Sequence, residues 1–582
     1  MARLLNHLVD EAALRAPEAV AVRCGGESLL YQQLARRSNG LARVLLETGL
    51  RKRDRVAVLL TRTFQVPISF YGIAAAGGIL VPIDPKSPAQ QVIRILRATG
   101  AQRLITEPRK GAVAREALAA CPEVSHIVGL EPQDEEMEGQ SELASRHYIP
   151  WPTVLEEACD QPPPVDVIDL DPAYILHTSG STGEPKLIQH THRSALSFVE
   201  WAAAEYSLTA EDRLSNHSSH HTCFATFDYY AAARAGAATV LLTPAVLMMP
   251  GSLSTLLEQE RVSVWYSVPT ALVQLSLRGS LEARDLSALR WVLFAGETFP
   301  EKHLRRLQKQ LPGARFSHVY GSTEVNVCTY YHLPQPRDLE TGDLETGDFE
   351  TDDLETGDLE TSDLGTSDLG TTVTEDPLPG DPLPIGRACS TSGTLVVDEQ
   401  LRPVPRGETG ELLVRGSTLM SGYWGDPERN LTALVRQTQA GDLEEIYFRT
   451  GDRVRESEDG QLAFVARTDR QVKVRGFRVE LEEVEAALLS LDGVNEGAVV
   501  TVPDGEGSLA IQAAVVLSSR RPEGMDAPAG DAGDGGEREL LSQLKKALPM
   551  QAIPSRIAIL DSLPRTPTGK TDRNTLRQRL TT

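Results

Sequence analysis

The sequence predicts an α/β fold in two parts, a large N-terminal part followed by a smaller C-terminal part. Between residues 50 and 330, short apolar runs of strand length alternate with segments of helical periodicity, which is the pattern of βαβ units. After residue 469 a shorter series begins, with one helix and two strands. A chain of 582 residues has room for several domains, because single domains mostly hold about 50 to 250 residues.

The predicted elements follow these patterns in chain order. Residues 1–11 are expected to form an amphipathic helix interrupted by acids, and strands and helices then alternate through the large part. A region of shorter β structure starting with residues 410–416 completes the large part. The predicted strands are residues 56–60, 173–176, 239–242, 291–294, 498–501 and 510–517, and the other predicted helices are residues 88–98, 302–310 and 480–489.

The composition predicts a soluble globular protein. Hydrophobic residues make up 41% of the chain and charged residues 24%, and the net charge is −23. This acidic balance disfavours nucleic-acid binding through electrostatics, and no segment predicts association with a membrane. The first predicted helix is too polar for the apolar core of a signal peptide, so export is not expected.

The cysteines and histidines predict neither a disulfide framework nor a structural metal site. The cysteines lie far apart without a Cys-x-x-Cys motif, which indicates a reducing compartment, the cytoplasm. Five histidines between residues 190 and 221 have no carboxylate or thiol at ligand spacing. The residues concerned are Cys24, Cys121, Cys159, Cys223, Cys328 and Cys389, and His190, His192, His217, His220 and His221.

Two segments of biased composition interrupt the predicted domains. Residues 338–372 hold seven tandem pentapeptides with 13 acids and no base, and their self-repulsion predicts a disordered, solvated insertion. A pentapeptide-repeat β-helix is excluded because seven units would make fewer than about two coils and could not bury a core. Residues 520–538, rich in Gly, Ala, Asp and Pro, are predicted to be a flexible loop in the small part.

The most informative segment is His177-Thr-Ser-Gly-Ser-Thr-Gly-Glu-Pro-Lys186. Its glycines let successive backbone N–H groups converge on one anion, and its hydroxyls and lysine add further donors to phosphate. The spacing is not that of a Walker motif, so a P-loop NTPase is disfavoured, and a mobile surface loop is the alternative. The candidate phosphate-binding residues are Thr178, Ser179, Gly180, Ser181, Thr182, Gly183 and Lys186.

This segment and its lead-in, residues 171–186, resemble the signature of adenylate-forming enzymes, which include acyl-CoA synthetases, luciferases and the adenylation domains of non-ribosomal peptide synthetases. Residues 30–34 and 76–84 follow in that family's order, and the resemblance covers nearly the whole chain. The chain is most similar to a stand-alone adenylation enzyme. The resemblance implies an adenylation core over residues 1–467 and a small, mobile C-terminal α+β lid domain over residues 468–582.

The resemblance also implies which side chains bind ATP and Mg²⁺. Val319-Tyr-Gly-Ser-Thr-Glu324 is similar to the family's Tyr-Gly-x-Thr-Glu, so Tyr320 is expected at the ATP site. Thr323 is expected on the α-phosphate and Glu324 on Mg²⁺, a hard cation that prefers oxygen ligands. In residues 447–452, Asp452 matches the aspartate that binds both ribose hydroxyls.

Three further residues are assigned by resemblance to the moving part of the enzyme. Arg467 is expected beside the ribose or the phosphates, and Asp469 at the hinge between the domains. Residues 563–573 are similar to the loop that delivers the catalytic lysine, which is Lys570 in this chain. A lysine that bridges the attacking carboxylate and the α-phosphate stabilises the charge that develops there, and losing such a donor costs on the order of 10²- to 10³-fold in rate.

The predicted acid pocket is apolar and partly aromatic. The aspartate that anchors the substrate amine in peptide-synthetase domains aligns with Cys223, and Asp228 is left as another anchor or as a helix cap. Such a pocket favours a compact hydrophobic acid, an aryl acid or a small cyclic amino acid. Residues 324–330, however, resemble stand-alone enzymes that load amino acids onto carrier proteins. The pocket residues are Cys223, Phe224, Phe227, Tyr266, Leu293, Ala295, Val319, Val327 and Cys328.

The resemblance therefore implies an adenylate-forming ligase that converts a carboxylic acid, preferably an amino acid, to an acyl-adenylate and then to a thioester. The chain ends twelve residues after Lys570, so the expected acceptor is a separate phosphopantetheinyl carrier protein, with coenzyme A as the alternative. Leu187, Cys223 and the acidic insertion also leave open a non-catalytic interaction subunit. The intact set of candidate ATP-binding residues and Lys570 argues against that reading.

Overall fold

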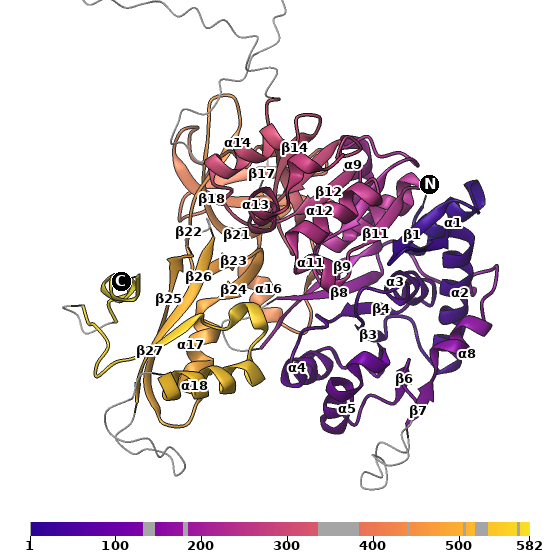
Figure 1. Cartoon of the computed structure of the whole chain (residues 1–582), viewed down its shortest axis with the longest axis horizontal. Coiled ribbons are helices and arrows are strands. Elements are labelled where there is room, and N and C mark those ends of the chain that lie inside the picture. Colours follow the sequence, from indigo (N-terminus) through magenta and orange to yellow (C-terminus); the bar gives the residue numbers. More distant parts are fainter. Residues whose placement is uncertain are drawn as a thin grey trace, which may run out of the picture.

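The computed structural model describes residues 2–131, 146–178, 184–335, 383–438, 443–504, 508–517, 534–566 and 571–581. These residues form the predicted α/β fold, with a large N-terminal part and a small C-terminal part beside it (Figure 1). The acidic repeat at 338–372 lies outside the described residues.

An eight-stranded sheet forms one layer of the large part, in the order β19-β9-β8-β4-β3-β5-β6-β7. The six consecutive strands from β8 to β7 in this order are parallel to one another. At the edge next to β8, strands β9 and β19 are added in antiparallel pairing. Its strands are β3 (Arg55–Leu59), β4 (Ile79–Pro82), β5 (Arg103–Thr106), β6 (His126–Val128), β7 (His147–Ile149), β8 (Pro172–Thr178), β9 (Lys186–Thr191) and β19 (Gly422–Tyr423).

A nine-stranded sheet forms the second layer, in the order β16-β15-β14-β13-β12-β10-β11-β1-β2. Six neighbouring strands, from β14 to β1, are parallel, and the antiparallel strands lie at its two ends. The strands are β1 (Val20–Cys24), β2 (Glu27–Leu30), β10 (Arg213–Asn216), β11 (Ala238–Leu241), β12 (Val264–Ser267), β13 (Trp291–Phe294), β14 (Arg315–Ser322), β15 (Asn326–His332) and β16 (Arg387–Ala388).

The helices of the large part cover both faces of these sheets, as parallel strands require. One hydrophobic core joins the facing sides of the two sheets through α1 (Leu5–Arg15), α2 (Tyr31–Glu47), α3 (Gln65–Ala75) and α9 (His192–Glu205). Helices α4 (Ala89–Thr99) and α5 (Gly111–Ala120) cover the other face of the eight-stranded sheet. The other face of the nine-stranded sheet is covered by α12 (Pro250–Gln259), α13 (Pro269–Arg278) and α14 (Glu301–Gln310).

Sequence explains the bounds of these helices. In α4, Val92, Ile93, Ile95 and Leu96 are buried on one face, and the helix ends at Gly100, whose φ of 61° suits a residue without a side chain. The remaining described helices of the large part are short: the 3₁₀-helices η1 (Pro108–Lys110) and η3 (Leu281–Ala283), α8 (Trp151–Glu156), the π-helix η2 (Thr226–Ala231), α10 (Ala232–Ala235), α11 (Pro244–Leu247) and α16 (Pro427–Ala433).

A third sheet completes the large part and leads into the small one. It has the order β17-β18-β21-β20, and β22 pairs with β21. The long strand β21 therefore pairs with three others and carries Asp452 near its end. The strands are β17 (Ser392–Val397), β18 (Thr409–Gly416), β20 (Leu434–Thr438), β21 (Glu444–Glu456) and β22 (Leu462–Arg467).

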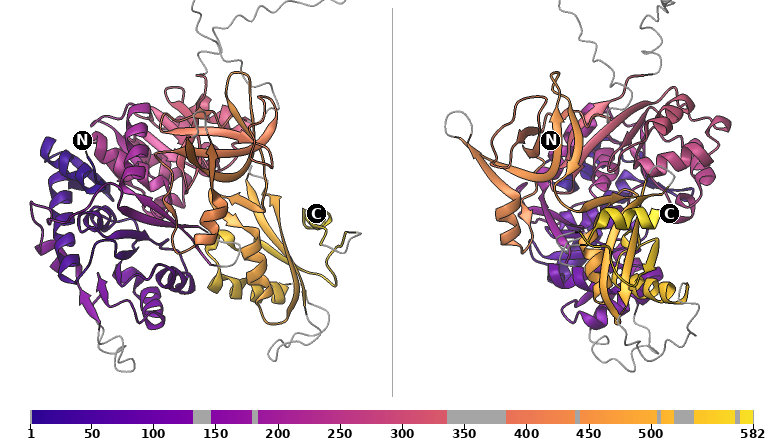
Figure 2. Two further views of the ribbon diagram at one scale, coloured as in Figure 1. Left: turned by 180° about the vertical axis from the view of Figure 1, so that it is seen from behind. Right: turned by 90° about the vertical axis from the view of Figure 1, so that its left-hand side faces the viewer.

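The small part consists of a hairpin and a three-stranded sheet with helices on both faces. The hairpin pairs β23 (Gln471–Val474) with β24 (Phe477–Glu480). The sheet contains β25 (Val494–Pro503), β26 (Leu509–Leu517) and β27 (Arg556–Ile559). Helices α17 (Leu481–Leu489) and α18 (Asp534–Ala547) share one core with it, and α19 (Arg573–Thr581) packs on its other face. Helix α19 lies on the side away from the large part (Figures 1 and 2).

The predicted strands and helices are all present, within a few residues at most ends. One prediction was wrong in part: residues 534–538 of the expected loop at 520–538 belong to α18, because a helix can begin directly after a Gly-rich segment once its apolar residues, such as Leu540 and Leu544, find a core. Residues 520–533 lie outside the described residues. Among the helices that the structure describes, none has the length and apolarity needed to cross a bilayer.

Candidate active site

The described ends of the predicted phosphate loop lie on two paired strands. Thr178 ends β8, Lys186 begins β9, and the two residues are register partners of the antiparallel pair. No helix follows the loop directly, in keeping with the non-Walker spacing. The Thr178 hydroxyl is buried and has no hydrogen-bond partner among the described residues. Ser179, Gly180, Ser181, Thr182 and Gly183 lie outside them.

The turn after β14 places Glu324 in the interior. Gly321 is required there, because a Cβ at this position would lie 1.7 Å from the Asn326 carbonyl oxygen. His190, on β9, lies with Nε2 2.8 Å from the Thr323 carbonyl oxygen and so ties the turn to the strand that carries Lys186. The Glu324 side chain is 0% exposed, and the Tyr423 hydroxyl donates a hydrogen bond to its Oε1 at 2.8 Å.

The hairpin of the small part supplies the counter-ion of Glu324. Arg478, on β24, donates from its Nη1 to both carboxylate oxygens, at 2.9 and 2.8 Å. Burial opposes the ionisation of Glu324, but the Arg478 charge and the hydrogen bond from Tyr423 favour it, and the pKa is lowered to about 2. The carboxylate is therefore charged at neutral pH, in a site where a positive charge must accompany it.

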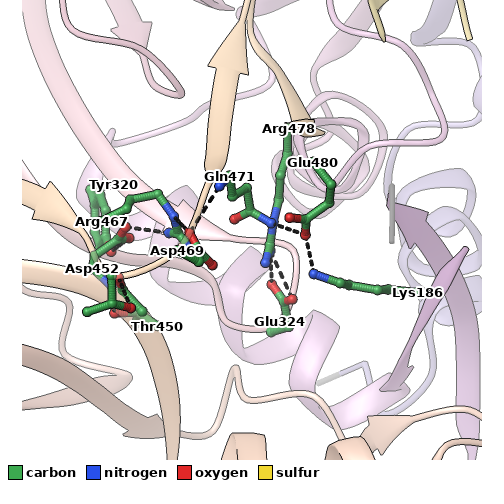
Figure 3. A network of polar contacts seen from close by, with 12 residues as sticks. Lys186, Tyr320, Glu324, Thr450, Asp452, Arg467, Asp469, Gln471, Arg478 and Glu480 are labelled. Atoms are coloured by element: carbon green, nitrogen blue, oxygen red, sulfur yellow. Dashed lines mark hydrogen bonds and ion pairs between the residues drawn. The ribbon is translucent and has the colours of Figure 1, made fainter. Parts of the chain in front are cut away.

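A second ion pair joins β24 to the start of β9. The Lys186 ammonium contacts the Glu480 carboxylate, and both side chains are nearly buried, at 10% and 6% exposed. Gln471, across the hairpin, donates to Glu480 as well. Burial and the nearby Arg478 lower the pKa of Lys186, whereas Glu480 opposes that shift. Figure 3 shows the two pairs side by side, with Arg478 and Glu480 both reaching from β24 towards the large part.

The residues predicted to bind the ribose lie beside these two ion pairs. The Asp452 carboxylate accepts hydrogen bonds from the Tyr320 hydroxyl and from Arg467, and its side chain is only 8% exposed. Arg467 also forms a fork with the Asp469 carboxylate, at 2.7 and 2.8 Å. Lys473 of the hairpin places its Nζ 5.7 Å from the centre of the Tyr320 ring. Burial lowers the pKa of Lys473.

The predicted acid pocket is packed with aromatic rings. Phe224 and Phe227 contact Tyr266, with ring centres 4.5 and 5.4 Å apart. Cys223 and Phe224 are partly exposed, whereas the seven other pocket residues are buried. Burial raises the pKa of the Cys223 thiol to about 11, so the sulfur carries no charge for an ammonium to bind.

Asp228 does not serve as a helix cap, one of the two roles that the sequence left open. It lies within η2, buried to 1% exposure, and accepts a hydrogen bond from Asn216 at 2.9 Å. Burial raises the pKa of this carboxyl group well above its ordinary value. The N-cap of η2 is Ala225, so the expectation of a helix cap at Asp228 was wrong, whereas its role as an amine anchor stays a prediction.

Lys570 lies outside the described residues, but its flanks are placed. Arg565 pairs with Glu496 at the start of β25, and the Asp572 N–H donates to the Pro564 carbonyl at 2.8 Å. Both flanks lie next to α19, on the outer side of the small part (Figure 2). The structure brings Lys186, Glu324, Asp452 and Arg467 together at the seam between the two parts, and the flanks of Lys570 lie elsewhere.

The sequence analysis missed Arg478, Glu480, Gln471 and Tyr423 as parts of the site. A signal was available for two of them: in a strand, side chains two residues apart share a face, so Arg478 and Glu480 must point the same way. The sequence does not show that Arg478 pairs with Glu324 and Glu480 with Lys186, because the members of each pair come from distant segments of the chain.

Two family models match the chain, one in each of its two parts. The family model of AMP-binding enzymes matches residues 9–346 and 364–424, and the model of the AMP-binding enzyme C-terminal domain matches residues 483–570. An L-proline–[L-prolyl-carrier protein] ligase of Pseudomonas fluorescens is 30% identical over 572 residues, 98% of each chain. A protein of the same name from Streptomyces coelicolor is 32% identical and covers 94% of this chain and 91% of its own.

Solved structures share the fold along the full chain. The amide bond synthetase McbA from Marinactinospora thermotolerans has a TM-score of 0.78 at 23% identity and covers 99% of each chain. An artificially fused adenylation-PCP di-domain, NpsA-ThdA from Klebsiella oxytoca, has a TM-score of 0.73 at 21% identity and covers 96% of this chain and 94% of its own.

Proposed function

The chain belongs to the family of AMP-binding enzymes, and from this premise we propose that it activates an amino acid with ATP and transfers it to the thiol of a separate carrier protein. One observation carries the proposal: side chains of the large part that suit phosphate, metal and ribose lie together where the small part contacts it (Figure 3). The relatives named as L-prolyl-carrier protein ligases support an amino acid as the substrate and a carrier protein as the acceptor.

In this proposal ATP binds across the ends of β8, β9, β14 and β21. The buried Thr178 hydroxyl, which lacks a described partner, fits a phosphate oxygen, and Lys186 supplies the positive charge beside it. Thr323 follows β14 at the α-phosphate position, and Asp452 accepts the ribose hydroxyls beside Tyr320. Arg467 holds Asp452 in place and adds a charge near the phosphates.

The site also fits Mg²⁺. Glu324 is an ionised carboxylate, and hard oxygen ligands of this kind are what Mg²⁺ prefers beside phosphates. When bound there, the metal would neutralise the phosphate charge that repels an incoming carboxylate. Glu324 is the residue that would hold it.

The first chemical step joins the amino acid to AMP. Its carboxylate attacks the α-phosphorus, the bond to pyrophosphate breaks, and the acyl-adenylate forms. We assign to Lys570 the role of stabilising the negative charge that builds on the α-phosphate oxygens. Asp469 is assigned as the hinge between a core domain over residues 1–467 and a lid domain over residues 468–582. In the second step the carrier thiolate attacks the acyl carbon and AMP leaves.

The acid pocket supports a compact, uncharged side chain. Its buried members, among them Leu293, Ala295 and Val319, leave apolar surface for a small ring or a short aliphatic group. All six cysteines are free thiols, which supports the reducing cytoplasm as the place of action.

The test is ATP–pyrophosphate exchange with the full chain over a panel of amino, aryl and short acyl acids, including L-proline. We expect exchange with a compact apolar amino acid, and we expect Lys570→Ala to lower it by on the order of 10²- to 10³-fold. Mass spectrometry then shows whether the acyl group reaches a phosphopantetheinylated carrier protein or coenzyme A. Exchange with aryl or acyl acids alone would overturn the proposed substrate class, and loading of coenzyme A alone would overturn the proposed acceptor.

A further inference from the structure

A serine, a histidine and an aspartate lie one after another beside the candidate ATP site. Ser219 Oγ is 2.8 Å from His221 Nδ1, and His221 Nε2 is 4.0 Å from Asp84 Oδ2, an ion-pair distance that is longer than a hydrogen bond. His221 and Asp84 are each 6% exposed, whereas Ser219 is partly exposed. A hydroxyl beside an imidazole that faces a carboxylate is the arrangement that activates serine as a nucleophile.

The loop that carries Ser219 is fixed without the help of its hydroxyl group. The Thr222 N–H and hydroxyl both donate to the Ser219 carbonyl oxygen, at 3.0 and 2.7 Å, and close the turn. Asp84 is held separately, because the Lys86 N–H donates to its Oδ1 at 2.9 Å. The Ser219 hydroxyl is therefore left to His221.

The charges around His221 favour the neutral imidazole that a general base requires. Burial lowers its pKa, and the charges of Arg62 and Lys86 add to this shift while Asp84 opposes it. Burial opposes the ionisation of Asp84, yet its pKa is lowered because His221 and the Lys86 N–H stabilise the charged form. A carboxylate next to Nε2 favours the proton on that nitrogen, so Nδ1 accepts from the Ser219 hydroxyl.

The place of the pair relative to the proposed ligands is defined by the neighbours of His221. Its ring stacks on that of His177, where the predicted phosphate loop starts, with ring centres 5.3 Å apart, and the centre of the Phe477 ring lies 6.4 Å away. Two residues after His221, the same loop contributes Cys223 to the predicted acid pocket. An acyl-adenylate that spans pocket and phosphate loop has its acyl–phosphate bond between them. Ser219 and His221 therefore border the position of that bond.

We propose that the chain also hydrolyses acyl-adenylates that no thiol consumes, with Ser219 as the nucleophile and His221 as its base. The inference rests on the proposed function for its substrate, the acyl-adenylate. In the first step the Ser219 hydroxyl gives its proton to His221 Nδ1 while Oγ attacks the acyl carbon. The bond between that carbon and the phosphate oxygen breaks, and AMP leaves with the electron pair. Asp84 stabilises the imidazolium that forms.

Water completes the cycle. The imidazolium passes its proton to solvent, and the neutral His221 then takes a proton from a water molecule that attacks the acyl-serine ester. The bond between the acyl carbon and Oγ breaks, Oγ recovers the proton from His221, and the free acid leaves. In sum, one acyl-adenylate and one water give the acid and AMP.

The experiment measures AMP release by the full chain with ATP and Mg²⁺, without carrier protein or coenzyme A. The acid is the member of the exchange panel, L-proline included, that gives the fastest pyrophosphate exchange. The readout is the ratio of AMP release to exchange, which cancels any change in adenylation itself. We expect Ser219→Ala and His221→Gln each to lower this ratio at least about tenfold. Ser218→Ala, at the adjacent and also partly exposed serine, is expected to leave it unchanged.

Two further readouts separate a nucleophile from a structural serine. Ser219→Cys keeps a nucleophile, and mass spectrometry is expected to find the acyl group as a thioester on the peptide that contains position 219. In a single turnover in H₂¹⁸O, the label is expected in the acid and not in AMP, because water attacks the acyl carbon and not the phosphorus. Thermal melts of each variant establish that it is folded.

The outcomes are distinct. An unchanged ratio in Ser219→Ala, an equal loss in Ser218→Ala, or label in AMP would overturn the inference and leave the proposed function standing. No AMP release by the unsubstituted protein in the absence of a thiol would overturn it as well. Failure of the unsubstituted protein to catalyse exchange with any acid would instead refute the proposed function and the inference together.

Discussion

At the scale of one residue, the hydrogen bonds of Asp452 leave part of its carboxylate available to a ligand. Its two oxygens accept from Tyr320 and from Arg467, and a carboxylate has about four acceptor positions. Two positions thus remain for a pair of neighbouring hydroxyls. Tyr320 and Arg467 also stabilise the Asp452 carboxylate, whose side chain is only 8% exposed.

Asp452→Asn is expected to raise the KM for ATP by about tenfold or more, because hydrogen bonds to a charged acceptor contribute about 1.5 to 3 kcal/mol. The rate at saturating ATP is expected to change less, since the ribose lies away from the reacting phosphorus. The measurement is pyrophosphate exchange against ATP concentration. Asp459→Asn, in an exposed turn, is the control, and an unchanged KM in Asp452→Asn would contradict the assignment.

The hairpin β23–β24 is the element on which the seam depends. Its turn carries two residues with positive φ, Arg475 at 51° and Gly476 at 82°. A Cβ on Gly476 would lie 2.4 Å from a methyl carbon of Val268, in the loop between β12 and α13. The tip of the hairpin can therefore approach the large part only with glycine at this position.

Gly476→Ala is expected to slow loading of the carrier protein more than pyrophosphate exchange. The added methyl group obstructs the observed seat of the hairpin, which adenylation does not need, and the left-handed backbone adds strain. Both half-reactions are measured on one preparation. Gly460→Ala, in an exposed turn with φ of 80° and no contact closer than 3.8 Å, controls for backbone strain alone. Equal losses in both half-reactions would argue against the hairpin as the obstacle.

The elements were largely predictable because their signals are local. An apolar run such as residues 291–294 gives a strand of those residues, and the alternation of strands and helices gives the class of fold. The candidate site was predictable as a set of residues from motif resemblance. Its pairing was not, because Arg478 and Glu324 are joined by tertiary contacts across 154 positions, and no local pattern encodes a partner at that distance. The burial of Asp228 could not be predicted for a related reason, because it follows from the packing of η2 and not from a local pattern.

At the scale of the whole molecule, the contact between the two parts contains an acid that titrates near neutrality. Glu483, on α17, is 7% exposed, and one of its oxygens has no hydrogen-bond partner among the described residues. Burial raises its pKa to about 7, while Arg94 of α4 and Lys186 oppose that shift and Glu480 adds to it. Helix α4 also meets the small part directly, where Arg94 donates to the Ala547 carbonyl oxygen at 3.4 Å.

This acid makes the stability of the protein fall as the pH rises. Between about pH 4.5 and 7 the folded protein keeps a proton that the unfolded chain has lost, so the free energy of unfolding declines across that interval and stays low above it. Glu483→Gln removes the decline, and its gain over the unsubstituted protein is expected to grow from pH 5 to pH 8, by up to about 3 kcal/mol. Denaturant unfolding at the two pH values measures the gain.

The neighbouring Glu482 supplies the control for this prediction, because it is exposed on the same helix turn. Glu482→Gln is expected to show the same unfolding free energy at both pH values as the unsubstituted protein. A gain from Glu483→Gln that does not grow with pH would show that Glu483 is not the titrating group.

The topology of the eight-stranded sheet has a consequence for synthesis of the chain on the ribosome. Strand β9 ends at Thr191, yet its outer neighbour β19 begins only at Gly422. Until more than 230 further residues have been translated, the backbone N–H and C=O groups along that edge lack their strand partner. An open edge is a template for pairing with other nascent chains. A chaperone that covers β9 is therefore expected to raise the soluble yield, and slower translation between β9 and β19, which prolongs the exposure of the edge, is expected to lower it.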